Sequence, residues 1–206
     1  MLKIKVPATS ANLGPGYDTF GLALNLFNEY IFNLSDSKNE LFVQIIDNNN
    51  LNLHLKEEDN LILNTVKYLK EIYPDKIRTN NLEIKALLKY PINRGLGSSA
   101  NAIIGTVVGL NKLFDLNMTN EDILKAALQL EGHPDNIVPT LTGGFTISKV
   151  ENETISYEKF TISDDFKILL LIPDFAIKTI DARQVLNNHI EIKHASQNIA
   201  NASLLS

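Results

Sequence analysis

Residues 91–100 read Pro91-Ile92-Asn93-Arg94-Gly95-Leu96-Gly97-Ser98-Ser99-Ala100, which places two glycines and two serines directly before a long apolar pattern. That pattern continues to Phe114 at helical spacing and predicts a buried helix. The first amides of a helix lack intrahelical partners and carry partial positive charge, so they favour an anion. Glycines allow close backbone approach, and serine hydroxyls can contact phosphate or Mg²⁺. The stretch predicts a phosphate-binding loop; a simple glycine-containing helix cap is the alternative.

Two common nucleotide-binding motifs are excluded by the same residues. The stretch lacks the lysine of G-x-x-x-x-G-K-[ST], and its glycines are not spaced as G-x-G-x-x-G. Strand and helix patterns instead mix along the chain, which predicts the α+β class. Strands are expected at residues 2–6, 20–34, 82–89, 145–150, 155–160 and 166–172.

Helix signals occupy the remaining apolar segments. Asp59 is expected to cap a helix that ends near Pro74, and Thr119 with Asp122 resembles a capping box that opens a helix reaching Leu130. His133 precedes Pro134, and we expect the following residues to be extended or to turn. Two further helices are expected at residues 181–186 and 195–205.

Composition limits the class of protein and the kind of site. The 206 residues are 44% apolar, enough for a substantial core. A net charge of −5 with scattered basic residues argues against nucleic-acid binding. No apolar run reaches the roughly 18 residues of a membrane span, and the N-terminus has no signal-peptide pattern, so a cytoplasmic location is expected. With no cysteine, a metal site must use oxygen or imidazole ligands, which suits Mg²⁺.

Three motifs in order resemble one family. Residues 91–100 resemble the second motif of the GHMP kinases, while Pro7-Ala8-Thr9-Ser10-Ala11-Asn12-Leu13-Gly14-Pro15-Gly16-Tyr17-Asp18-Thr19-Phe20-Gly21 and Glu131-Gly132-His133-Pro134-Asp135-Asn136 are similar to the homoserine kinases among them. The resemblance covers essentially the whole chain. It implies ATP-dependent phosphorylation of L-homoserine to O-phospho-L-homoserine in threonine biosynthesis, and assembly as a homodimer.

The same resemblance implies the architecture. Residues 1–154 would form a lobe like domain 2 of ribosomal protein S5, and residues 155–206 would begin a ferredoxin-like C-terminal lobe, with the active site between the lobes. Homoserine kinases continue further and contain a third glycine-rich motif, which does not follow Gly144 here. We therefore expect either a fragment or a shortened relative, with strand edges left unpaired in the second lobe.

The resemblance also assigns roles to residues. ATP would lie over the loop from Pro91 to Asn101, and Mg²⁺ would be held by Glu131 and Ser99, with Ser98 as the alternative serine. The substrate would contact residues from all parts of the chain: Asn12, Asp18, His133, Asp135 and Arg183. Thr179 would lie near the transferred phosphate, and Asn136 occupies the position where mevalonate-type relatives carry an aspartate base. The loop residues expected at ATP are Pro91, Ile92, Asn93, Arg94, Gly95, Leu96, Gly97, Ser98, Ser99, Ala100 and Asn101.

Simple chemistry agrees with the substrate roles but leaves alternatives open. An amino acid presents an ammonium, which Asp18 can pair, and a carboxylate, which Arg183 can grip with two hydrogen bonds. Taken singly, Asn12 and Asp18 could cap backbone, Glu131 could face solvent and Arg183 could be a surface charge. Lys85, Lys89 and Arg94 either attract nucleotide or are solvated strand charges.

The sequence is therefore consistent with three functions. The first is homoserine phosphorylation without a dedicated base, in which the acceptor hydroxyl gives its proton to the phosphate. The second is a GHMP kinase with another acceptor, such as mevalonate. The third is a shortened, non-catalytic module that binds nucleotide or amino acid.

Overall fold

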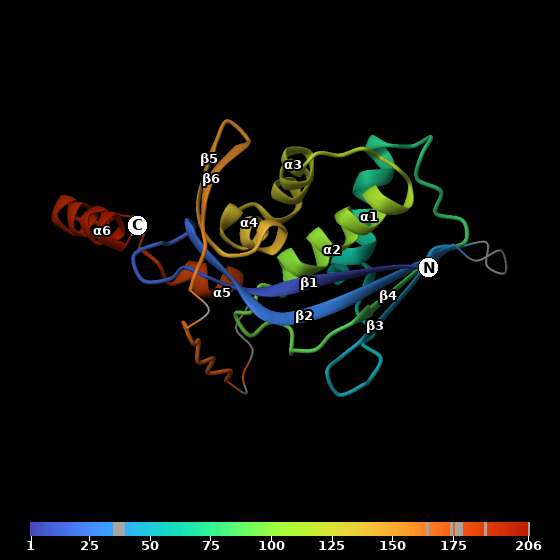
Figure 1. The fold of residues 1–206 in the computed structure, drawn as a ribbon, viewed down its shortest axis with the longest axis horizontal. Helices are drawn as coiled ribbons and strands as arrows, with labels where there is room; N and C mark the ends of the chain where they lie inside the picture. The colour runs from blue at the N-terminus through green and yellow to red at the C-terminus, as the bar shows by residue number, and fades with distance from the viewer. Residues whose placement is uncertain (35–39, 164, 174, 176–178, 188, 206) are drawn as a thin grey trace.

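A six-stranded sheet with helices on one face forms the body of the protein (Figure 1). The computed structural model describes residues 1–34, 40–163, 165–173, 175, 179–187 and 189–205. Strands β1 (Leu2–Ala11) and β2 (Phe20–Leu34) pair antiparallel, and β2 continues the sheet in the order β3-β4-β2-β5-β6. Strand β3 (Phe42–Ile46) is parallel to β4 (Leu82–Leu87), so the sheet is mixed. The α+β expectation is confirmed.

Helix α2 (Ser98–Leu113) packs across β1 and β2 and forms the centre of the core. Two glycines permit the close approach: a Cβ on Gly105 would lie 2.7 Å from the ring of Tyr30, and one on Gly109 would lie 2.1 Å from the ring of Phe32. Helix–sheet contact at this distance fixes the start of α2 relative to β1. The loop that precedes α2 therefore rests on a rigid support.

Helix α1 (Leu61–Ile72) differs from expectation at its first residue. The cap is Asn60, whose side-chain oxygen accepts a hydrogen bond from the Leu63 amide at 3.2 Å. Asp59, the predicted cap, instead ends the short 3₁₀ turn η1 (Glu57–Asp59). Both residue types cap well, so composition alone does not choose between adjacent candidates.

The capping box at Thr119 is confirmed. Helix α3 (Asn120–Glu131) opens with the Thr119 side chain accepting from the Asp122 amide, while the Asp122 carboxylate accepts from the Thr119 amide at 2.8 Å. The prediction after α3 was wrong, because residues from Pro134 form helix α4 (Pro134–Thr142) instead of an extended segment or turn. Proline at the first position of a helix loses no hydrogen bond, since that amide has no intrahelical partner.

Replacing Thr119 with alanine should lower the free energy of unfolding by about 1 kcal/mol, because one cap is lost at α3. Asp122→Ala should cost a similar amount, and the double variant little more, since the two side chains serve each other. Urea denaturation measures all three. Additive losses would show that the two residues act independently.

Strands β5 (Phe145–Glu151) and β6 (Thr154–Phe160) form a hairpin that extends the same sheet. The sheet therefore runs past residue 154, and the division of the chain at residues 154 and 155 stays a prediction. The strand expected at 166–172 was wrong: these residues pair with no strand within the described part, and Leu169 and Leu171 are 84% and 86% exposed. An apolar run becomes a strand only where a neighbour completes its hydrogen bonds.

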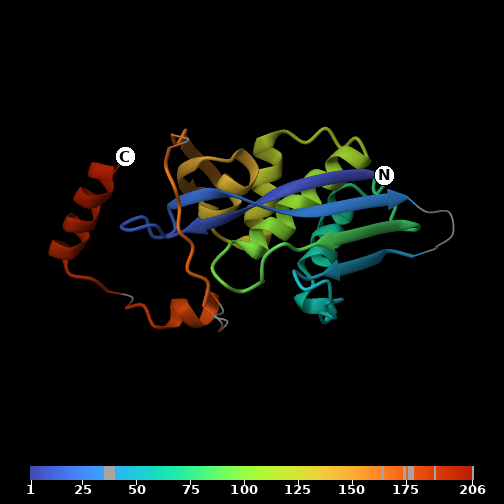
Figure 2. The same ribbon diagram turned by 60° about the horizontal axis from the view of Figure 1, so that its bottom comes forward.

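Two helices follow in the C-terminal part. Helix α5 (Thr179–Gln184) is bonded through Arg183 to Asp18 in the loop between β1 and β2. Helix α6 (Ile192–Leu205) stands at one end of the molecule (Figure 2). The side-chain amide of Asn198 on α6 donates to the Pro15 carbonyl at 3.0 Å. None of the helices in the described residues is long and apolar enough to cross a membrane.

Candidate functional site

A pocket of about 490 Å³ lies where the loop before α2, the end of α3, the start of α4 and helix α5 meet. Its walls combine a glycine loop, ionisable groups and apolar residues of the C-terminal part. The lining residues are Ala11, Asn12, Tyr17, Asn93, Arg94, Gly95, Leu96, Gly97, Ser98, Ser99, Glu131, His133, Asp135, Asn136, Pro173, Phe175, Ala182, Arg183 and Leu186. Most of the predicted site residues therefore share one pocket.

The glycine loop has the backbone geometry of an anion site. Gly97 caps α2 in the left-handed conformation with φ +62°, no side chain makes a cap hydrogen bond there, and the first turn contains no acidic residue. A Cβ on Gly97 would lie 2.0 Å from Thr9 Oγ1, whereas one on Gly95 would have no atom of the described residues within 4 Å. Position 97 therefore requires glycine because Thr9 leaves no room for a Cβ, whereas the structure leaves room for one at position 95. The amides that begin α2 remain available to a phosphate.

Four of the loop residues that were predicted to contact the nucleotide lie outside the pocket. Pro91, Ile92, Ala100 and Asn101 do not line the pocket. Asn101 is fully buried and uses its amide inside the core: its nitrogen donates to the carbonyls of Val6 and Pro7, and its oxygen accepts from Asn28 and from the hydroxyl of Tyr30. Asn101 therefore anchors the start of α2 to β1 and β2.

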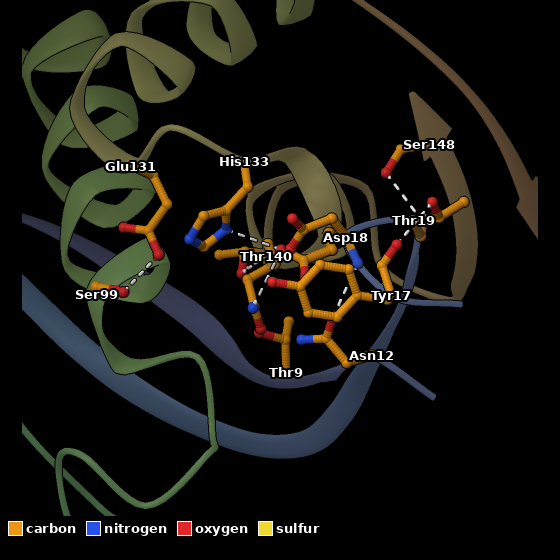
Figure 3. A network of polar contacts seen from close by, with 12 residues as sticks. Thr9, Asn12, Tyr17, Asp18, Thr19, Ser99, Glu131, His133, Thr140 and Ser148 are labelled. Carbon is orange, nitrogen blue, oxygen red and sulfur yellow. Dashed lines mark hydrogen bonds and ion pairs between the residues drawn. The ribbon is translucent and has the colours of Figure 1, made fainter. Parts of the chain in front are cut away.

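Glu131 and Ser99 both line the pocket, and their side chains point toward each other, as Figure 3 shows. The hydroxyl of Ser99 donates to Glu131 Oε1 at 2.6 Å. Burial raises the pKa of Glu131, and the hydrogen bond from Ser99 opposes that rise only in part. Glu131 is half-buried and bonded to Ser99, so it is not a helix end that simply faces solvent. A cation bound beside it would stabilise its charged form.

His133 and Asp135 form a second polar pair at the start of α4. His133 is extended, as its place before a proline predicts, and its Nδ1 lies 3.0 Å from Asp135 Oδ1. Asp135 is fully buried, and its other oxygen, Oδ2, has no hydrogen-bond partner among the residues that the structure describes. A buried acceptor without a partner is costly, and a donor from a ligand in the pocket would satisfy it.

The pKa of His133 is raised, chiefly by its hydrogen bond to Asp135. A raised histidine pKa means that this pair stabilises the folded state fully below the ordinary pKa of about 6.5 and loses that contribution as pH rises through the folded value. Asp135→Asn should lower the pKa of His133, because the hydrogen bond to a carboxylate and its charge are both lost. Titration of the His133 ring by NMR measures the change; an unmoved pKa would mean that another group sets it.

Asp18 and Arg183 bind each other. Arg183 Nη1 lies 3.0 Å from Asp18 Oδ2, and Nη2 lies 2.5 Å from Oδ1, so helix α5 is tied to the loop between β1 and β2. Asn12 Oδ1 accepts from the Asp18 amide at 2.8 Å, which holds the loop in shape. Arg183 lines the pocket, while Asp18 lies beside it. The side chain of Thr179, the remaining predicted residue, lies outside the described part of the structure.

Sequence reasoning assigned no role to two residues of the first motif. The guanidinium of Arg183 lies 5.5 Å from the ring centre of Tyr17, a cation–π contact. Thr9 is fully buried and donates its hydroxyl to Asn136 Oδ1 at 2.7 Å. Both lie inside a motif that was noticed, but only the folded chain shows what they touch.

Comparison with known proteins identifies the family. The model of the GHMP kinases N terminal domain matches residues 60–144. The homoserine kinase of Halothermothrix orenii is 41% identical over the whole chain, which spans 66% of its length, and that of Clostridium acetobutylicum is 35% identical, with 67% of its length spanned. The chain belongs to the GHMP kinase family, in its homoserine kinase branch.

Solved structures agree with this assignment. The crystal structure of homoserine kinase from Cytophaga hutchinsonii superposes with a TM-score of 0.79 at 26% identity, covering 98% of this chain and 65% of that one. Mevalonate kinase from Methanococcus jannaschii superposes with a TM-score of 0.57 at 18% identity, covering 78% of this chain and 56% of that one, and shares the fold. The GHMP kinase fold expected from the motifs is therefore confirmed.

Proposed function

We propose that this GHMP kinase chain supplies the nucleotide site and most of the acceptor site of an ATP-dependent homoserine kinase, which forms O-phospho-L-homoserine and ADP. The observation that carries the proposal is the meeting of the phosphate loop with Asp135, His133 and Arg183 in one pocket. Phosphoryl transfer requires mainly that two oxygens be positioned and charge be neutralised. At the start of α2 no side chain caps the amides and the first turn contains no acidic residue, so these amides fit a phosphate chain.

Charges beside the pocket suit a zwitterion. Asp18 would take the ammonium group and Arg183 the carboxylate, with the unpartnered Oδ2 of Asp135 as a further acceptor for the ammonium. Asn12 would contact the same substrate from the loop. Thr179 is proposed near the transferred phosphate on the family resemblance.

We also propose that Mg²⁺ binds between Glu131 and Ser99. Among the described residues there is no cluster of three acidic or histidine side chains that could hold a metal, so water and phosphate oxygens would complete the shell. Bound Mg²⁺ neutralises charge on the phosphates. Glu131→Gln should weaken Mg²⁺-dependent ATP binding about tenfold, since a single charged ligand is lost. Calorimetry at several Mg²⁺ concentrations measures the loss, and equal affinities would exclude Glu131.

No side chain is proposed as general base. Asn136 cannot accept the hydroxyl proton as a carboxylate would, so the acceptor oxygen bonds to the γ-phosphorus while its proton passes to the phosphoryl oxygens and the electrons of the breaking bond leave with ADP. If Asp135→Asn bound homoserine normally but lost several orders of magnitude in turnover, Asp135 would be a base and this mechanism would be wrong.

A coupled ADP-release assay of the 206-residue chain with homoserine and with mevalonate tests the function. Turnover with homoserine supports the proposal, and turnover with mevalonate supports the other acceptor class. Because the chain spans 66% of the length of the Halothermothrix orenii relative, the assay is paired with calorimetry. Binding of ATP and homoserine without product would identify a non-catalytic binding module.

A further inference from the structure

Thr9 touches both halves of the proposed site. It follows an irregularity in the pairing of β1 with β2 between Pro7 and Thr9, where the strand changes register. Its backbone amide donates to the Leu96 carbonyl at 3.2 Å, and its hydroxyl donates to Asn136 Oδ1 at 2.7 Å. One buried residue therefore joins the phosphate loop to the first turn of α4.

The contact with Thr9 fixes which way the Asn136 amide faces. With Oδ1 held by the hydroxyl, Nδ2 lies 3.4 Å from Asp135 Oδ1. The flipped amide would set its oxygen against the Asp135 carboxylate, so that two acceptors would face each other. Both neighbours thus favour the same orientation. Asn136 is one of the residues that line the pocket, and its Nδ2 carries two hydrogens, of which the contact with Asp135 uses at most one.

We propose that Thr9 is a positioning residue that holds Asn136 as a hydrogen-bond donor to the acceptor oxygen. This inference rests on the proposed kinase function. An acceptor oxygen that receives the Nδ2 hydrogen turns its own O–H away from Asn136 and keeps a lone pair for the γ-phosphorus. The bonds that form and break are those of the proposed transfer, and the hydroxyl proton still passes to the phosphoryl oxygens. Thr9 acts only through Asn136.

Thr9→Val keeps the shape of the side chain and removes the hydroxyl. We expect kcat with homoserine to fall about tenfold, because one hydrogen bond that orients the reactant is lost, while KM for ATP changes less than about twofold. Thr9→Ser keeps the hydroxyl and should restore kcat. In an Asn136→Ala background, Thr9→Val should cause no further loss.

Thr65→Val is the matched control, since Thr65 is also fully buried and donates its hydroxyl to the Leu61 carbonyl in α1. It should leave kcat unchanged, and thermal unfolding of each variant checks folding. An unchanged kcat in Thr9→Val would overturn the proposal, as would a raised KM for ATP at constant kcat, which indicates loop packing alone.

A second readout separates this inference from the proposed function. The side-chain amide of Asn136 gives its own NMR signals, which should shift in Thr9→Val and return in Thr9→Ser. If the wild-type chain does not phosphorylate homoserine, the function fails, yet the amide signals still test the contact. Signals that are the same in wild type and Thr9→Val would then refute the role of Thr9.

Discussion

Gly97→Ala is expected to weaken ATP binding roughly 100-fold, which corresponds to about 2.7 kcal/mol. Gly97 has φ +62°, a conformation that costs alanine about 1–2 kcal/mol. Its Cβ would also lie 2.0 Å from Thr9 Oγ1 and 2.8 Å from Asn136 Oδ1. Thr9 cannot simply withdraw, because its amide is bonded to Leu96 beside the glycine. The loop must therefore move, and the amides at the start of α2 lose their arrangement.

Gly95→Ala is the matched control for Gly97→Ala. Gly95 has a similar φ of +71°, but within the described part of the chain no atom lies within 4 Å of a Cβ placed there. Only the backbone cost applies, so we expect a loss of about tenfold or less. Calorimetry with Mg²⁺-ATP compares the two variants, and thermal unfolding verifies that both fold. Equal affinities would mean that the crowding around Gly97 does not shape the nucleotide site.

Features that depend on neighbouring residues were predictable from the sequence. The glycine loop, the start of α2 and the capping box at Thr119 each rest on a few adjacent residues, and all three are present in the structure. Helix α4 was not predicted because the effect of a proline depends on its position: proline disrupts a helix in the interior but is favoured at the first residue, where Pro134 lies.

Contacts between distant parts of the chain were not predictable from residue patterns. Thr9 and Asn136 are 127 residues apart, and Asp18 and Arg183 are 165 apart. The family resemblance placed Asp18 and Arg183 at one substrate, but not in contact with each other. At residues 166–172 a strand was predicted that the structure does not contain. The apolar run has the local pattern of a strand, but a strand also needs a neighbouring strand to complete its hydrogen bonds.

Arg183→Gln is expected to raise KM for homoserine roughly 30-fold, because a two-bond contact to the substrate carboxylate is lost from a partly exposed site. Asp18→Asn should act similarly through the ammonium group. Asp18 and Arg183 form an ion pair with each other in the structure, and their side chains are 31% and 36% exposed, respectively. Homoserine would therefore replace this one ion pair by two ion pairs of its own. KM for ATP should change little in both variants, since neither side chain belongs to the phosphate loop.

Exchanging the two residues separates binding from structural support. The Asp18→Arg, Arg183→Asp double variant keeps an ion pair between α5 and the loop but reverses the positions of the charges. It should regain the thermal stability lost by either single variant, yet remain defective with homoserine because each charge then meets the wrong end of the zwitterion. Restored turnover in the exchanged variant would show that the pair only holds α5 in place. Normal thermal stability with a raised KM for homoserine would show that both side chains bind the substrate. Homoserine would then have to separate an ion pair whose members are 165 residues apart in the sequence.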